Sequence, residues 1–541
     1  MGRGVKVAVI GGVFAVMVGG AGYGAYNVVS ALNGDGGSSG SEAKSGPPGK
    51  DEVAETTEKF FTAWEKGDAT TAASYTNNAT VAGPLLTAYG EDAHITGVEI
   101  TPGTAAGTSV PFTVKAKVAY EGTTKPLSYK STLTVVRGET TGRALVDWKP
   151  SVVHPDLKDG DTLVTAESAT PQIQAVGRDG AVLSKEKYPS LGPILAKLRE
   201  KYGDKAGGTP GVELMVRHTT TQAPDTPLLT LTEGRPGKLR TSLSASVQAA
   251  AEKAVKRYDK SSVVAVKPST GEVLAVANNR ADGFNAAFQG TVAPGSTMKI
   301  ITAAMLIDNG VTDMNGPAPC TDSAMWQGQT FKNLTGMKPN ESATLANTFM
   351  RSCNTGFIKL IDEVTDSSLT EEAEERFGLG QDNWQTGIAS FDGSVPASPG
   401  PDRAANAIGQ GKVQMNPLNM ASVTATAITG EFHQPYLVPF DLDGRKPATA
   451  KGLPKSTASQ LKQMMRLTAT AAQGTAVNAM SGLRGDIGAK TGSAEVDGHA
   501  TSDSWFTGFR DDVAAAAMVQ GGGHGGDAAG PIVADVLRVG G

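Results

Sequence analysis

The sequence predicts a multidomain chain with four parts: a transmembrane helix, a small α+β domain, a small intermediate domain, and a large α/β domain with an antiparallel sheet flanked by helices. Three observations lead to this prediction. The length of 541 residues exceeds one ordinary domain. An uncharged run near the N-terminus is long enough to cross a bilayer. The hydrophobic pattern changes near residues 51 and 240, and the predicted segments are 1–32, 33–50, 51–157, 158–238 and 239–541.

The composition fits a folded protein and argues against several classes of function. Hydrophobic residues make up 39% of the chain and charged residues 19%, as in ordinary globular domains. The net charge of -5 gives no basis for a nucleic-acid partner. The six histidines are scattered and no Cys/His cluster has ligand spacing, so we expect neither a metal site nor a cofactor.

The uncharged run of residues 7–29 follows the positive charges of Arg3 and Lys6. Such charges place the N-terminus in the cytoplasm and the remainder of the chain outside. We therefore expect an uncleaved, single-pass anchor in the cell membrane and an extracytoplasmic main body. A cleaved signal peptide is the alternative, because small residues at 21–25 offer a cleavage site. Residues 33–50 are rich in Gly, Ser and Pro and predict a flexible tether.

Residues 51–157 combine helical and alternating patterns. Val53, Phe60 and Trp64 recur at helical spacing, and residues 70–75 predict a second short helix. Four alternating stretches predict strands at 95–100, 110–120, 127–136 and 144–148. Helices followed by a curved antiparallel sheet make a small α+β domain.

The remaining two segments give fewer but clear elements. Within 158–238 the patterns predict two strands around an Asp-Gly turn at 170–183, a helix at 194–201 and a strand at 228–231. From residue 239 they predict a helix at 244–255, a hairpin at 262–276, strands at 505–509 and 513–519, and a helix at 531–537.

Ser296 and Lys299 are the first candidate catalytic pair. Pro294 and Gly295 interrupt the preceding segment, and an apolar run at helical spacing follows at once. Serine and lysine three residues apart share a helical face. A lysine can take the serine proton only if burial or positive charge lowers its pKa. The same spacing also occurs at Ser41/Lys44, Ser184/Lys187 and Ser459/Lys462, so it needs support from other motifs.

Two later motifs give that support. Ser352 and Asn354, in Ser-Cys-Asn, can hydrogen-bond both a lysine and a peptide substrate, and the hydroxyl of Ser352 can relay a proton. Lys490, in Lys-Thr-Gly-Ser, supplies positive potential that keeps Lys299 neutral and attracts a carboxylate. Ser-x-x-Lys, Ser-x-Asn and Lys-Thr-Gly in this order are the motif set of penicillin-binding proteins and serine β-lactamases.

Residues 240–541 therefore resemble the transpeptidase domain of class B penicillin-binding proteins. Further support lies at 270–275, 409–411 and 416–421. The stretch Trp148-Lys149-Pro150-Ser151-Val152-Val153-His154-Pro155 resembles the end of the N-terminal domain of methicillin-resistance-type penicillin-binding proteins, a nuclear-transport-factor-2-like cone. Residues 160–235 resemble a shortened form of the pedestal (dimerisation-type) domain of class B proteins. The departures are Cys353 within the second motif and residues 429–432 in place of a glycine pair.

The resemblance implies acyl transfer on peptidoglycan stem peptides. Ser296 would attack the penultimate D-Ala carbonyl, expel the terminal D-Ala and pass the acyl group to a neighbouring amine, and β-lactams would trap the acyl-enzyme. Thr491 and Ser493 would bind the substrate carboxylate, and Gly492 would leave room for an acyl chain along the strand. The backbone N–H groups of Ser296 and Ser493 would form the oxyanion hole. Cell-division or elongation proteins, such as a SEDS-type glycosyltransferase, are the candidate protein partners.

Two alternative functions stay open. A D,D-carboxypeptidase or β-lactamase would use the same motifs for hydrolysis, although the Glu-x-x-x-Asn stretch of class A β-lactamases is not found between Asn354 and Lys490. A penicillin-recognising sensor or a scaffold would be free to lose Lys299, Asn354 or Lys490, and the sequence retains all three.

The two cysteines, Cys320 and Cys353, can form a single disulfide in an exported protein. Two buried thiols are an equally good interpretation of the sequence.

Overall fold

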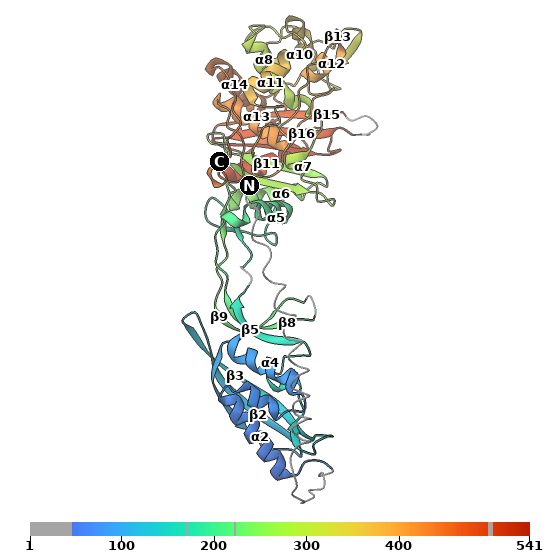
Figure 1. The fold of residues 1–541 in the computed structure, drawn as a ribbon. Helices are drawn as coiled ribbons and strands as arrows, with labels where there is room; N and C mark the ends of the chain where they lie inside the picture. The colour runs from blue at the N-terminus through green and yellow to red at the C-terminus, as the bar shows by residue number, and fades with distance from the viewer. Residues whose placement is uncertain (1–45, 169–170, 221–222, 496–500) are drawn as a thin grey trace, which may run out of the picture. The chain divides into compact units, whose positions relative to one another are not determined.

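The computed structural model describes residues 46–168, 171–220, 223–495 and 501–541 (Figure 1). Its contacts divide the chain into two compact units. The first comprises the residues up to Ser168 together with Val212–Glu233, and the second comprises Ala169–Gly211 and Gly234–Gly541. The predicted anchor, residues 1–32, lies outside the described residues, as does most of the tether. Among the described residues, no helix combines the length and the apolar character needed to cross a membrane.

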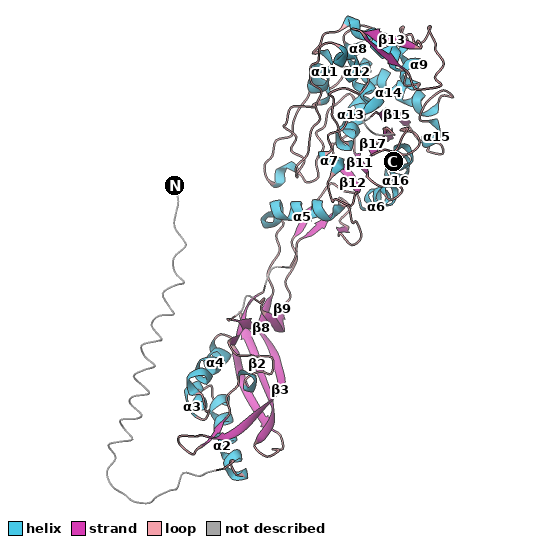
Figure 2. Cartoon of the chain, turned by 90° about the vertical axis from the view of Figure 1, so that its right-hand side faces the viewer, coloured by secondary structure: helices cyan, strands magenta, loops and turns pink. Residues whose placement is uncertain are grey.

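The first unit packs three helices against antiparallel strands (Figure 2). The helices are α2 (Lys50–Glu65), α3 (Ala69–Ser74) and α4 (Ala79–Glu91). A four-stranded sheet has the order β1-β2-β3-β4 and comprises β1 (Ile95–Pro102), β2 (Ser109–Tyr120), β3 (Thr123–Arg137) and β4 (Ala144–Val146). These elements confirm the predicted α+β domain, except that the sequence analysis missed α4, whose interior contains Gly83 and Pro84.

A tight aromatic cluster forms the centre of this unit. Phe60 and Trp64, one helical turn apart on α2, are buried together with Phe61, Tyr89 and Phe112. The Trp64 ring meets Tyr89 edge-on at a centroid distance of 5.4 Å, a geometry that aromatic pairs favour. The helical spacing of apolar residues therefore predicted the buried face of α2.

The expected pedestal domain is not confirmed, because its residues divide between the two units. Strands β5 (Asp161–Glu167), β8 (Val212–His218) and β9 (Thr226–Thr232) form a three-stranded sheet in the first unit. Strands β6 (Gln174–Val176), β7 (Val182–Leu183) and β10 (Lys238–Arg240), with α5 (Leu191–Tyr202), lie in the second. The apolar residues of α5 belong to the main core of the second unit, so segment 158–238 has no separate core.

The second unit is built on a five-stranded antiparallel sheet with the order β12-β11-β17-β16-β15. The strands are β11 (Ser261–Val266), β12 (Val273–Asn279), β15 (Ile487–Ala494), β16 (Asp503–Arg510) and β17 (Val513–Val519). Both faces of β17 are buried, as in a sheet covered by helices on each side. Helices α6 (Ala245–Val255) and α16 (Ala529–Gly540) cover one face, and α13 (Pro417–Thr429) covers the other.

A mainly helical region lies beyond the β15 edge of this sheet (Figure 1). It comprises α8 (Lys299–Asp308), β13 (Ser323–Trp326), β14 (Gln329–Lys332), α9 (Leu345–Met350), α10 (Asn354–Leu360), α11 (Ser368–Phe377), α12 (Pro401–Ala407) and α14 (Lys455–Thr470). Two shorter helices, α7 (Ala286–Gln289) and α15 (Val477–Met480), complete the unit.

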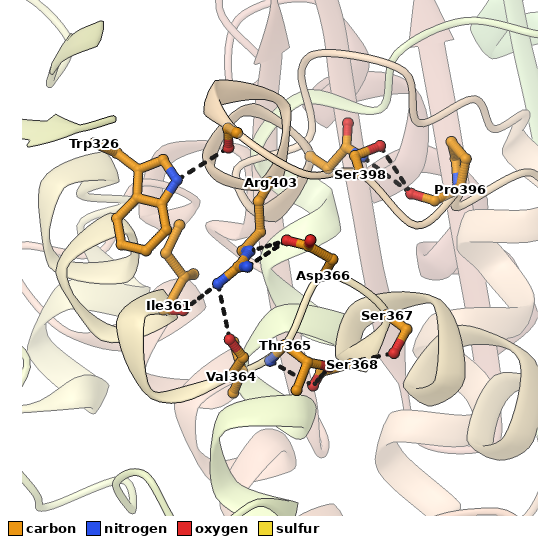
Figure 3. A network of polar contacts seen from close by, with 12 residues as sticks. Trp326, Ile361, Val364, Thr365, Asp366, Ser367, Ser368, Pro396, Ser398 and Arg403 are labelled. Atoms are coloured by element: carbon orange, nitrogen blue, oxygen red, sulfur yellow. Dashed lines mark hydrogen bonds and ion pairs between the residues drawn. The ribbon is translucent and has the colours of Figure 1, made fainter. Parts of the chain in front are cut away.

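Arg403 on α12 contacts several segments of this helical region (Figure 3). Its guanidinium donates to the Asp366 carboxylate and to the carbonyl of Val364 at 2.9 Å. The same guanidinium lies over the Trp326 ring, 5.3 Å from its centroid, and the Trp326 indole donates to the Gly400 carbonyl. One cation thereby joins the hairpin β13–β14 to the loop before α11.

Candidate active site

Ser296 lies in a 3₁₀ turn, Gly295–Met298, directly before α8. The sequence analysis expected Ser296 and Lys299 to share a face of one helix, and the structure starts that helix only at Lys299. Gly295 has a φ of +53°, and a Cβ there would lie 2.6 Å from the carbonyl oxygen of Ser493. A Cβ on Gly409 would lie only 1.7 Å from the Gly295 carbonyl oxygen. Two glycines therefore permit the close approach that holds Ser296 beside β15.

Lys299 is the neighbour of the Ser296 hydroxyl. Its Nζ lies 2.8 Å from Ser296 Oγ, 2.9 Å from the Ser352 carbonyl oxygen and 2.6 Å from Asn354 Oδ1. The amine is fully buried, at 0% exposure. The structure thus brings the first two predicted motifs together around a single amine.

The other Ser-x-x-Lys pairs have different surroundings. Ser459 is exposed on α14, and Lys462 forms an ion pair with Asp486 at 2.9 Å. Lys187 is exposed, and the pair Ser41/Lys44 lies outside the described residues.

Ser352 sits between the two lysines of the site. Its hydroxyl accepts a hydrogen bond from Lys490 Nζ at 2.8 Å, while its carbonyl accepts the bond from Lys299. The backbone of Ser352 has a φ of +59°, which is uncommon for a residue other than glycine. Such conformations concentrate at functional sites, where surrounding contacts maintain them.

The electrostatics of the two lysines favour the neutral form of Lys299. Burial, and then the charge of Lys490, hold the pKa of Lys299 well below its usual value. Burial alone lowers the pKa of Lys490 to about 7. A buried amine whose pKa is lowered and which is hydrogen-bonded to a serine hydroxyl is suited to accept the proton of that serine.

Strand β15 carries the third motif at the edge of the sheet. Lys490 and Thr491 are buried, Ser493 is half-buried, and Thr491 Oγ1 lies 2.7 Å from Thr475 Oγ1. Besides the role expected for it, Gly492 has a structural reason to lack a side chain. A Cβ on Gly492 would lie 2.9 Å from the Pro294 carbonyl oxygen, so its missing side chain makes room for the turn that carries Ser296.

Several contacts of the site were not found from the sequence. Asn333 Oδ1 accepts hydrogen bonds from the backbone N–H groups of Asn354 and Thr355, and the Lys332 carbonyl accepts from Asn354 Nδ2. Thr475 was missed as well. None of these residues stands at a fixed spacing from a motif, so no sequence signal pointed to them.

A disulfide joins Cys320 and Cys353, with a Cα–Cα distance of 6.1 Å. This settles the alternative between a disulfide and two thiols, and it attaches the second motif to the loop before β13. Within the described ranges, no cluster of three His, Cys, Asp or Glu residues is arranged to hold a metal ion.

Two family models match the chain. The penicillin binding protein transpeptidase domain matches residues 261–538, and the NTF2-like N-terminal transpeptidase domain matches residues 52–161. The second match confirms the nuclear-transport-factor-2-like domain whose end the stretch around Trp148 resembles.

The chain is also similar to named peptidoglycan D,D-transpeptidases. Peptidoglycan D,D-transpeptidase PbpA of Mycolicibacterium smegmatis is 29% identical over 376 residues, covering 57% of this chain and 74% of that protein. PbpA of Mycobacterium tuberculosis is 29% identical over 214 residues, covering 33% of this chain and 43% of that protein.

Two solved structures share the fold. The D,D-transpeptidase domain of a peptidoglycan glycosyltransferase from Eggerthella lenta has a TM-score of 0.53 and 21% identity, covering 69% of this chain and 98% of that one. A chain from a peptidoglycan synthase complex that coordinates polymerization and crosslinking has a TM-score of 0.55 and 20% identity, covering 70% and 91%.

Proposed function

The chain belongs to the penicillin-binding protein transpeptidase family, whose model matches just over half of it, and we propose that it is a peptidoglycan D,D-transpeptidase acting through an acyl-enzyme on Ser296. The observation that carries this proposal is the contact of the buried Lys299 amine with the Ser296 hydroxyl at 2.8 Å. The relatives named PbpA support the reaction class.

In the first half-reaction, neutral Lys299 takes the proton from Ser296 Oγ as the oxygen attacks the carbonyl carbon of the penultimate D-Ala. The new C–O bond forms a tetrahedral oxyanion, which the backbone N–H groups of Ser296 and Ser493 stabilise. The C–N bond then breaks. The departing amine of the terminal D-Ala receives the proton of the Ser352 hydroxyl, which takes a replacement proton from Lys490 Nζ at 2.8 Å.

In the second half-reaction, an amine of a neighbouring stem peptide attacks the acyl carbon and gives up its proton through Ser352 to Lys490. The C–O bond to Ser296 then breaks, and protonated Lys299 returns its proton to Ser296 Oγ. Lys490, Thr491 and Ser493 bind the carboxylate of the donor peptide, and Asn354 binds the peptide amide. β-Lactams mimic the D-Ala-D-Ala end and leave Ser296 acylated. No step in this scheme uses a metal or a cofactor.

The cellular setting is part of the proposal. Residues 1–32 anchor the chain in the cell membrane as a single span, with both described units extracytoplasmic. The likeness to a chain of a peptidoglycan synthase complex supports a partner that polymerises glycan strands, such as a SEDS-type glycosyltransferase.

The proposal is tested by labelling the full-length protein with a fluorescent penicillin and following both the gain and the loss of label. Ser296→Ala removes the nucleophile, and Ser459→Ala is the matched control because Ser459 belongs to another Ser-x-x-Lys pair. We expect label that persists for hours in the wild type and in Ser459→Ala and is absent in Ser296→Ala. Label lost within seconds would indicate a hydrolase. A folded wild-type protein that takes no label would refute the proposal.

A further inference from the structure

Asn333, directly after β14, caps the helix that begins with the second motif. Its Oδ1 accepts hydrogen bonds from the backbone N–H groups of Asn354 at 2.8 Å and Thr355 at 3.1 Å, the first two residues of α10. Free N–H groups at a helix start need an acceptor. The residue before the helix, Cys353, supplies no side-chain oxygen, and its sulfur is bonded to Cys320. The cap therefore comes from a residue 21 positions earlier in the chain.

The orientation of the Asn333 carboxamide is fixed at its other end. Its Nδ2 donates to the Thr321 carbonyl at 2.7 Å, which leaves Oδ1 facing the start of α10. The carbonyl of the preceding residue, Lys332, accepts from Asn354 Nδ2 at 2.9 Å. This second bond orients the Asn354 amide, whose Oδ1 then meets Lys299 Nζ at 2.6 Å. Two consecutive residues thus hold both the main chain and the side chain of Asn354.

We propose that Asn333 is a positioning residue for acyl transfer, which keeps Asn354 in contact with Lys299 by capping α10. The proposal rests on the function proposed above, because it assigns the contact between Asn354 and Lys299 a part in the reaction. The hydrogen bonds of Asn333 go to Thr321, Asn354, Thr355 and, at 3.7 Å, the Cys320 sulfur, so it acts on Lys299 through Asn354. Small displacements of such a group are costly, because about 1 Å of misplacement can lower a rate on the order of 100-fold.

Two substitutions separate positioning from general support of the loop. Asn333→Ala removes the cap. Asn333→Asp keeps the acceptor oxygen for the helix N–H groups, loses the donor to the Thr321 carbonyl, and adds a negative charge two hydrogen bonds away from Lys299 Nζ. The matched control is Asn340→Ala, because Asn340 lies on the same segment and bonds to Ser342 and Asn347 instead. The measurement is the second-order rate constant of acylation by a fluorescent penicillin as a function of pH, with thermal melting of each full-length variant.

We expect Asn333→Ala to lower the acylation rate on the order of 10- to 100-fold, with Asn340→Ala within about threefold of the wild type. Asn333→Asp should recover part of the rate that Asn333→Ala loses, when each variant is compared at its own pH optimum. Its rising limb should move to higher pH, because the new carboxylate raises the pKa of Lys299 and more base is needed to keep that amine neutral. A residue that supports the loop without facing the contact between Asn354 and Lys299 would leave the position of the limb unchanged.

Three results would overturn the inference. The acylation rate of Asn333→Ala could lie within about threefold of the wild type, or Asn340→Ala could lose as much rate as Asn333→Ala. The third result is a pH–rate profile of Asn333→Asp that rises at the same pH as that of the wild type. If Asn333→Ala does not fold, the Asn333→Asp profile decides alone. A wild-type protein that is not acylated at all would instead refute the proposed function, so the two failures are distinguishable.

Discussion

Gly409→Ala should displace the turn that carries Ser296 and largely abolish acylation. Gly409 has a φ of +82°, so any side chain brings backbone strain of about 1–2 kcal/mol. The larger effect is steric. A Cβ there would lie 1.7 Å from the Gly295 carbonyl oxygen, whereas real Cβ contacts are rarely shorter than about 3.0 Å. The two backbones must therefore separate by more than about 1 Å, which predicts a loss of acylation on the order of 100-fold.

Gly122→Ala is the matched control for this substitution. Gly122 also has a φ of +82°, but a Cβ there would meet no atom within 4 Å. It should lower the free energy of unfolding by about 1–2 kcal/mol and leave the rate of acylation unchanged. Both variants are compared with the wild type by thermal melting and by the second-order rate constant with a fluorescent penicillin. Equal rates in Gly409→Ala and Gly122→Ala would refute the steric argument.

Three further predictions concern other parts of the second unit. The rate of acylation should rise with pH as Lys299, whose pKa is lowered, becomes neutral, and it should fall above about pH 7 as Lys490 loses its proton. A rate that rises only near pH 10, about the ordinary pKa of lysine, would contradict this. Replacing Cys320 and Cys353 by serine opens a loop with a sequence separation of 33 and should lower the free energy of unfolding by roughly 3–4 kcal/mol, and an unchanged midpoint in guanidinium chloride would count against it. Arg403→Ala should lower the free energy of unfolding by about 2 kcal/mol and lower the melting temperature accordingly. An Arg403→Lys variant as unstable as Arg403→Ala would show that the positive charge contributes nothing to stability.

Much of the fold was accessible from the sequence because its patterns are local. Apolar residues at helical spacing predicted α2 and α6, and short apolar runs beside turn residues predicted the hairpin β11–β12 and the pair β16–β17. Gly83 and Pro84 concealed α4, since both residues disfavour a helix interior. The intermediate segment was assigned one domain because it resembles the pedestal of class B proteins, but its strands divide between the two units. Their partners are set by long-range pairing, such as that of β6 with β10, which no local pattern reveals.

In the candidate site, too, local motifs were predictable from the sequence and long-range contacts were not. Ser296, Lys299, Ser352, Asn354 and Lys490 stand at fixed spacings within motifs, and the structure brings them within hydrogen-bond distance of one another in a continuous chain. The residues that hold these groups in place are far from them in the sequence and reach them only in the folded chain. Asn333 reaches α10 across 21 positions, and Gly409 meets Gly295 across more than a hundred. Neither contact follows from spacing.

The most direct test of the central claim is to find the residue that carries the acyl group. The protein is exposed to benzylpenicillin, digested and analysed by mass spectrometry, with Ser296→Ala treated in parallel. The account predicts one adduct, on the peptide that contains Ser296, and none in the variant. An adduct on the peptide of Ser184 or Ser459, or an adduct that persists in Ser296→Ala, would contradict it.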